Sequence, residues 1–189
     1  KVLLSMSQTR TAEVPLAADQ KVWEIGRRIP APERVAAARE LIKGPPAHKD
    51  WVWAKETLLL DALIAKKRDV EVEVQAIQVG PVVCLSNPAE YFVSYGLQLK
   101  KRSGFPMTFP VELANGCVGY VPDEEAFGPH GGGYETRLTS YSNLEITAGT
   151  QFMNIGLELA AKMKPAKLPE RPNGPAGKPW AYGDQPPQL

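Results

Sequence analysis

The sequence has few of the features that mark the commonest classes of functional site. Its 189 residues include two cysteines, Cys84 and Cys117, which make neither a disulfide framework nor a paired-cysteine zinc motif. No apolar run approaches the roughly 18 residues of a membrane span, and no basic, apolar and small-residue pattern marks a signal peptide. The formal net charge is +1 and the basic residues stand in short groups. Nothing in the composition therefore predicts a nucleic-acid or acidic-membrane partner.

Two stretches that superficially suggest chemistry lack the rest of their motifs. The triple glycine Gly131–Gly133 has no strand before it, no helix after it and no Lys-Ser/Thr pair, so it is not a phosphate-binding loop. Ser86 follows an apolar strand but is flanked by Leu85 and Asn87, without the glycines of a nucleophile elbow. Both functions are excluded on these patterns.

What is present is the composition of a soluble globular protein, 43% hydrophobic and 23% charged, long enough for one domain or a large piece of one. The 18 prolines concentrate between Pro30 and Pro46 and from Pro165 onward, where they mark connections. We predict three parts: a lead-in with two helices over residues 1–69, a folded block over 70–164, and an extended proline-rich tail over 165–189. The chain begins with Lys1, which favours a mature or cleaved product.

Hydrophobic periodicity predicts an α/β fold. Alternation with a period of two predicts a strand over 70–76, and Gly80-Pro81 predicts a turn that pairs it with 82–85 as a hairpin. Helical spacing predicts three helices that cover a mixed sheet, over 33–43, 50–67 with Asp50 as a cap, and 147–163. Further expected elements are an edge or joining strand within 1–22, a helix over 88–101, a strand over 107–114, and a long connection over 115–133 with a short turn at 123–127. We expect this fold to be an incomplete half-domain, whose exposed strand edges need a partner to cover them.

Glu90 is the most informative single residue, and spacing alone leaves two interpretations open. Asn87-Pro88-Ala89-Glu90 fits the N-cap, N1, N2 and N3 positions of a helix, so Glu90 could close a capping box. The same carboxylate could instead be a ligand. On spacing the cap is favoured, because such caps are common.

Three other candidates also have ordinary structural interpretations. Tyr120 fits a half-buried aromatic residue, Cys117 a small buried residue, and His130 a loop histidine. One histidine and one carboxylate are too few for a zinc site, which needs three or four ligands.

Several ordered motifs resemble the neutral/alkaline (non-lysosomal) ceramidase family, particularly bacterial members of ill-defined substrate. The resemblance covers roughly residues 70–163 and identifies the block as the C-terminal part of that family's catalytic domain. The motifs are Val74-Gln-Ala-Ile-Gln-Val-Gly80, Asn87-Pro-Ala-Glu-Tyr-Phe92, Leu97-Gln-Leu-Lys-Lys-Arg-Ser103, Leu113-Ala-Asn-Gly-Cys-Val-Gly-Tyr-Val-Pro122 and Gly132-Gly-Tyr-Glu135.

The resemblance implies a zinc-dependent amidase that cleaves the N-acyl bond of a sphingoid lipid. It implies that Glu90 and Tyr120 bind zinc and that Tyr134 lies beside the reacting amide as a catalytic residue. The family's other two zinc ligands are histidines, and these and its nucleophilic serine have no matching segment in this chain. Cys117 stands where a tyrosine is usual, which leaves either a thiolate near the metal or a small buried side chain; His130 is the other possible near-site residue.

We therefore expect part of a zinc amidohydrolase, completed by an upstream fragment of the same precursor or by a separate subunit that carries the histidines and the nucleophile. The expected substrate is a lipid-like amide, and the resemblance favours a periplasmic or secreted location. Two alternatives stay open: a non-catalytic scaffold or assembly subunit derived from this fold, and a hydrolase of another amide or ester.

Overall fold

The computed structural model describes residues 13–169, whose centre is a mixed four-stranded sheet with the strand order β1-β2-β3-β5. β1 pairs antiparallel with β2, β2 antiparallel with β3, and β3 parallel with β5. The predicted α/β class with a mixed sheet flanked by helices is confirmed. The sheet strands are β1 (Leu16–Gly26), β2 (Asp69–Val79), β3 (Val82–Ser86) and β5 (Met107–Val111).

The β2–β3 hairpin forms where alternation and turn chemistry predicted it. Val79 pairs with Val82 across the turn, and Gly80 has a φ of 60°, a left-handed conformation that costs glycine little. Gln78 is buried inside the sheet, and its Nε2 donates to the carbonyls of Gly80 at 2.8 Å and Lys164 at 2.7 Å. The segment that follows the last helix is thus fastened to the hairpin.

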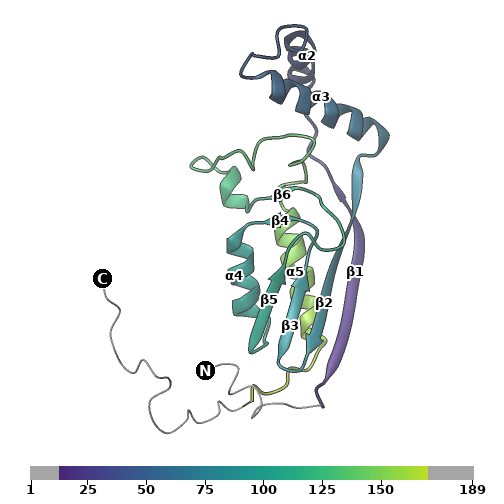
Figure 1. The fold of residues 1–189 in the computed structure, drawn as a ribbon, viewed down its shortest axis with the longest axis vertical. Coiled ribbons are helices and arrows are strands. Elements are labelled where there is room, and N and C mark those ends of the chain that lie inside the picture. The colour runs from purple at the N-terminus through teal and green to yellow at the C-terminus, as the bar shows by residue number, and fades with distance from the viewer. Residues whose placement is uncertain (1–12, 170–189) are drawn as a thin grey trace, which may run out of the picture.

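Two helices cover one face of the sheet, α4 (Val93–Arg102) and α5 (Ala148–Ala161), with α5 lying along the strands (Figure 1). Tyr95 and Leu99 of α4 and Phe152, Ile155 and Leu159 of α5 are buried. They pack against the inward-facing side chains of the strands. These include Val72, Val74 and Ala76 of β2 and Val83 and Leu85 of β3.

The other two long helices do not cover the sheet, contrary to the prediction. α2 (Pro32–Leu41) and α3 (Trp51–Lys66) pack against each other as a hairpin, which stands beyond the end of β1 and β2 in Figure 1. Within α3, only Ala54, Thr57 and Leu60 are buried, so few of its apolar side chains contribute to a core. Asp50 precedes α3 at the N-cap position but makes no side-chain capping hydrogen bond.

The predicted helix over 88–101 begins later than expected, and Glu90 does not cap it. Glu90 and Tyr91 form the short strand β4 (Glu90–Tyr91), which pairs in parallel with β6 (Tyr120–Val121). Asn87 Oδ1 accepts the amide of Ala89 at 3.0 Å, a local turn that keeps residues 87–90 out of helical geometry. The capping-box interpretation of Glu90 is therefore wrong.

A long connection joins β6 to α5. It contains the short 3-10 helix η1 (Glu124–Phe127), whose N-cap Asp123 accepts the amide of Ala126. The predicted turn at 123–127 is confirmed. The proline-rich tail prediction falls largely on residues 170–189, outside the described range. The expected strand within 1–22 corresponds to the edge strand β1, with residues 1–12 also outside it.

Candidate functional site

The β4–β6 pair brings Glu90 and Tyr120 directly opposite each other. Their Cα positions are register partners in the parallel ladder, and the amide of Glu90 donates to the carbonyl of Gly119 at 3.0 Å. Side chains of laterally paired residues project to the same face of a sheet. A carboxylate and a phenol that are thirty residues apart in the sequence therefore lie side by side on one surface.

Two further tyrosines complete an aromatic cluster around this pair, which we call the tyrosine cluster (Tyr120, Tyr134 and Tyr141). The ring of Tyr120 meets Tyr134 edge-on with centroids 5.3 Å apart and Tyr141 edge-on at 5.6 Å. The Tyr141 hydroxyl donates to Glu90 Oε1 at 2.7 Å. The predicted site residues Glu90, Tyr120 and Tyr134 are therefore brought together.

Cys117 is exposed, so its interpretation as a small buried residue is wrong. It lies beside the tyrosine cluster, whereas His130 does not. The Cys117 sulfur lies 3.4 Å from the Tyr141 hydroxyl. Because that hydroxyl has one proton and donates it to Glu90, the thiol is the donor in this contact. His130 is exposed in the glycine-rich loop, and within residues 13–169 no described hydrogen bond, ion pair or ring contact joins it to the cluster.

The environment favours the neutral forms of the phenols. The pKa of Tyr120 is raised to about 12, first by hydrogen bonding with Tyr134, then by loss of solvent and by the negative charge of Glu90. The pKa of Tyr141 is also raised, first by its contact with Cys117 and then by its hydrogen bond to Glu90. Near neutral pH both hydroxyls therefore keep their protons and can donate hydrogen bonds.

Tyr141 is the main site residue that the sequence reasoning missed. It lies in an irregular loop with no periodicity and outside the quoted motifs, so no local pattern marks it. One indirect signal existed in Gly119. A Cβ on that glycine would lie 1.9 Å from the Tyr141 carbonyl oxygen, so only glycine permits this close approach of the two loops.

Arg28, just beyond β1, holds the loop that carries Tyr134 and Tyr141. Its Nε donates to the Leu144 carbonyl at 2.9 Å, Nη1 to Thr136 at 3.1 Å and Nη2 to Ser142 at 3.0 Å. Its guanidinium also lies over the Phe127 ring, 4.8 Å from the centroid. Burial lowers the pKa of Arg28 to about 10, which still leaves the group charged at neutral pH. The cation fastens the loop at three points.

The α2–α3 hairpin provides a second attachment for the same loop. Glu56 Oε2 accepts from both the amide, at 3.1 Å, and the hydroxyl, at 2.5 Å, of Ser140. Arg34 Nη2 donates to the Leu138 carbonyl at 3.1 Å, and the Arg137 guanidinium lies 4.0 Å from the centre of the Trp53 ring. The lead-in region therefore helps to position the tyrosine cluster.

The described residues do not form a complete metal site. Among the described residues, no group of three His, Cys, Asp or Glu side chains gathers in a way that could hold a metal ion. The carboxylate of Glu90 and the phenol of Tyr120 are oxygen donors of the kind that zinc accepts beside imidazole. Their register fits two ligands of a shared site, and the remaining positions would need donors from elsewhere.

In the described part of the chain, no helix is long and apolar enough to cross a membrane.

Comparison with known proteins gives matches only among solved structures. No family model and no curated protein matches the chain. One matching structure is described as a ceramidase complexed with C2, at 17% identity and a TM-score of 0.42, over 55% of this chain and 17% of that one. Another is neutral ceramidase from Pseudomonas aeruginosa, at 13% identity and a TM-score of 0.43, over 82% of this chain and 30% of that one. The chain thus spans less than a third of either protein.

Proposed function

We propose that this chain supplies part of the active site of a zinc-dependent amidohydrolase that resembles neutral ceramidase and cleaves the N-acyl bond of a lipid-like amide. The observation that carries the proposal is the pairing of Glu90 with Tyr120 across β4 and β6, with Tyr134 against Tyr120. These three residues stand in separate sequence motifs of the ceramidase resemblance. Their convergence on one surface supports a shared role.

Glu90 and Tyr120 would hold the zinc ion, which when bound supplies a Lewis acid for the amide carbonyl. Two further ligands, expected to be histidines, and the nucleophile would come from an upstream fragment of the same precursor or from a separate subunit. A periplasmic or secreted location belongs to the same proposal. The chain's own contribution is to fix its two oxygen donors at one register.

Tyr134 would donate a hydrogen bond to the oxygen of the amide carbonyl as negative charge develops on it. Its side chain is 58% exposed, so a substrate can reach it. Tyr141 would hold the Glu90 carboxylate in orientation through its 2.7 Å hydrogen bond. Arg28 keeps the loop that presents both tyrosines in place.

The test is purification of the chain with whatever polypeptide accompanies it, followed by a hydrolysis assay with a short-chain N-acyl sphingoid amide. Removing one oxyanion donor costs about 100- to 1000-fold in kcat, so Tyr134→Phe is expected to lower kcat by that order. The zinc content should stay unchanged, because Tyr134 is not a ligand. Full activity of Tyr134→Phe in a zinc-loaded assembly would refute its role.

A scaffold or assembly subunit is the second candidate, and the outer face of the sheet favours it. The side chains that point away from α4 and α5 include Ile77, Val79, Met107 and Phe109, which are 41–49% exposed. An apolar sheet face of this kind suits packing against another layer of structure. If the chain purifies alone, folded and zinc-free, and adding candidate partner chains gives neither zinc binding nor hydrolysis, the scaffold function is favoured.

A further inference from the structure

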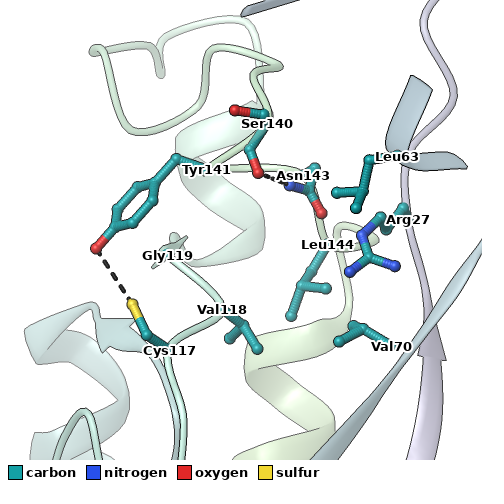
Figure 2. A pocket seen from close by; sticks show the side chains of 10 residues that line it. All are labelled: Arg27, Leu63, Val70, Cys117, Val118, Gly119, Ser140, Tyr141, Asn143 and Leu144. Atoms are coloured by element: carbon teal, nitrogen blue, oxygen red, sulfur yellow. Dashed lines mark hydrogen bonds between the residues drawn. The ribbon is translucent and has the colours of Figure 1, made fainter. Parts of the chain in front are cut away.

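A hollow that has not yet been assigned a role adjoins the tyrosine cluster and shares Tyr141 with it. It encloses about 190 Å³ between the end of β1, the C-terminal half of α3, the start of β2 and two loops. Figure 2 shows Cys117 and Tyr141 on one side of this hollow and Arg27 on the other. We call it the Arg27 pocket.

Four aliphatic side chains form the apolar wall of the Arg27 pocket. They are Leu63, Val70, Val118 and Leu144. Leu144 is 4% exposed, and Val70 and Val118 pack against the core, so this wall is fixed in place. An apolar wall of a few side chains suits a short hydrocarbon body.

Arg27 places an incompletely paired cation in the same pocket. Its Nη1 donates to the carbonyls of Lys67 at 3.2 Å and Arg68 at 3.4 Å, while its Nε is buried without a hydrogen-bond partner among residues 13–169. Burial lowers the pKa of Arg27, and the negative charge of Asp69 opposes this effect. None of the ion pairs found in the described range includes Arg27.

In the neighbouring Arg28, by comparison, every guanidinium nitrogen has a hydrogen-bond acceptor. Each of its three nitrogens donates to a carbonyl. A buried donor left without a partner costs about 1–3 kcal/mol, and such groups in native proteins usually have a ligand, an ion or water to explain them. Among residues 13–169, by contrast, no hydrogen bond involves Nη2 of Arg27, and both hydrogen bonds of this guanidinium come from Nη1. Nη2 is therefore the nitrogen that can bind a ligand in the pocket.

We propose that the Arg27 pocket binds the carboxylate of a small amphipathic anion, with its charge at Arg27 and its short apolar body against Leu63, Val70, Val118 and Leu144. Because Tyr141 belongs to both the pocket and the tyrosine cluster, and Cys117 lines the pocket in contact with it, the anion lies next to the proposed reaction centre. This step rests on the proposed function: the substrate is then an amide in which one arm carries a carboxylate. Arg27 selects that arm by charge.

The test measures binding of hexanoate and of its neutral isostere hexanamide to the full 189-residue chain. Cys117 is the reporter, because it lines the pocket and is exposed; a Cys84→Ala background removes the other thiol. Hexanoate is expected to slow modification of Cys117 by a thiol reagent in a saturable way. Hexanamide should bind at least about tenfold more weakly, since charge-assisted hydrogen bonds exceed neutral ones by that order.

Arg27→Gln tests the cation directly, because it removes the charge and the two Nη1 hydrogen bonds while keeping a polar side chain. It should weaken hexanoate binding by about tenfold or more and bring it to the level of hexanamide. Arg39→Gln removes the same charge from an exposed site and should leave binding unchanged. Circular dichroism and thermal melts of both variants show that the fold is kept.

Equal protection by hexanamide, retention of hexanoate binding in Arg27→Gln, or a lack of saturation would each overturn the proposal. The assay requires neither zinc nor turnover. Failure here with Glu90-dependent zinc binding intact would reject the pocket alone. Hexanoate binding that depends on Arg27, together with zinc binding that does not depend on Glu90, would reject the zinc site and retain the anion pocket.

Discussion

Two regions of this molecule are stabilised by different kinds of interaction: the sheet with its two helices, and the end that carries the tyrosine cluster, which we call the site end. The body, made of β1, β2, β3, β5, α4 and α5, is an apolar layer in which the sheet packs against two helices. The site end, by contrast, is irregular chain fastened by polar contacts from Arg28, Glu56 and Arg34. The body therefore sets whether the chain folds, and the polar contacts set where Tyr134 and Tyr141 stand.

The largest expected effect breaks the body alone. Leu159 is 2% exposed in the core of α5, and Leu159→Ala should lower the free energy of unfolding by about 2–5 kcal/mol through lost contacts and a residual cavity. Denaturant unfolding measures the loss. The rate at which a thiol reagent modifies Cys117 in the folded protein should not change, and a large increase in that rate would show that the two regions are not independent.

A smaller loss of stability, with a larger change at the site, is expected for Arg28→Met. Three carbonyls lose a charged donor, which should cost about 2–3 kcal/mol in unfolding free energy. The freed loop should withdraw Tyr141 from Cys117 and raise the reactivity of that thiol. Arg28→Lys keeps the charge but not the three-way fork, so it should recover only part of both properties.

The result that would contradict the positioning role of Arg28 is a variant that loses stability while Cys117 reactivity and the Tyr141 environment stay as in the parent chain. Tyrosine fluorescence gives a second measure of that environment. A normal site in Arg28→Met would mean that the α2–α3 hairpin holds the loop by itself.

The smallest effect is expected at the surface of the body. Lys162 and Asp19 form an exposed ion pair at 2.7 Å between the end of α5 and β1, and this contact lowers the pKa of Asp19. A carboxyl with a lowered pKa stabilises the fold above its unfolded pKa, and the contribution is lost as the pH falls through the folded pKa. Because solvent screens the pair, Lys162→Met should leave the melting temperature at pH 7 unchanged within error.

The comparison also explains which features could be predicted from sequence. Periodicity reports one face of a long element, so the β2–β3 hairpin, α4 and α5 were predictable from their alternating or helical spacing. The pattern at Glu90 misled because Pro88 at a helix N1 position is indistinguishable by spacing from Pro88 in a turn. A two-residue strand such as β4 exists only through its long-range pairing with β6, which no local pattern encodes.

For a related reason, the sequence could not predict where α2 and α3 pack or that Tyr141 contacts Glu90. An amphipathic stripe shows that a helix has a partner but does not say whether that partner is a sheet or a second helix. Tyr141 reaches Glu90 because its loop is held back across Gly119 by Arg28 and the α2–α3 hairpin. The motif resemblance named Glu90, Tyr120 and Tyr134, while the contacts that bring them together could be seen only in the structure.

The most direct test of the central claim is the zinc content of the assembled protein with and without the Glu90 carboxylate. The measurement is zinc per assembly by elemental mass spectrometry after gel filtration, for the parent, Glu90→Gln and Glu112→Gln. Glu112 accepts the amide of Tyr91, next to Glu90, at 3.1 Å, so it controls for loss of a nearby charge. We predict that Glu90→Gln loses zinc while Glu112→Gln keeps it; unchanged zinc in Glu90→Gln would contradict the assignment.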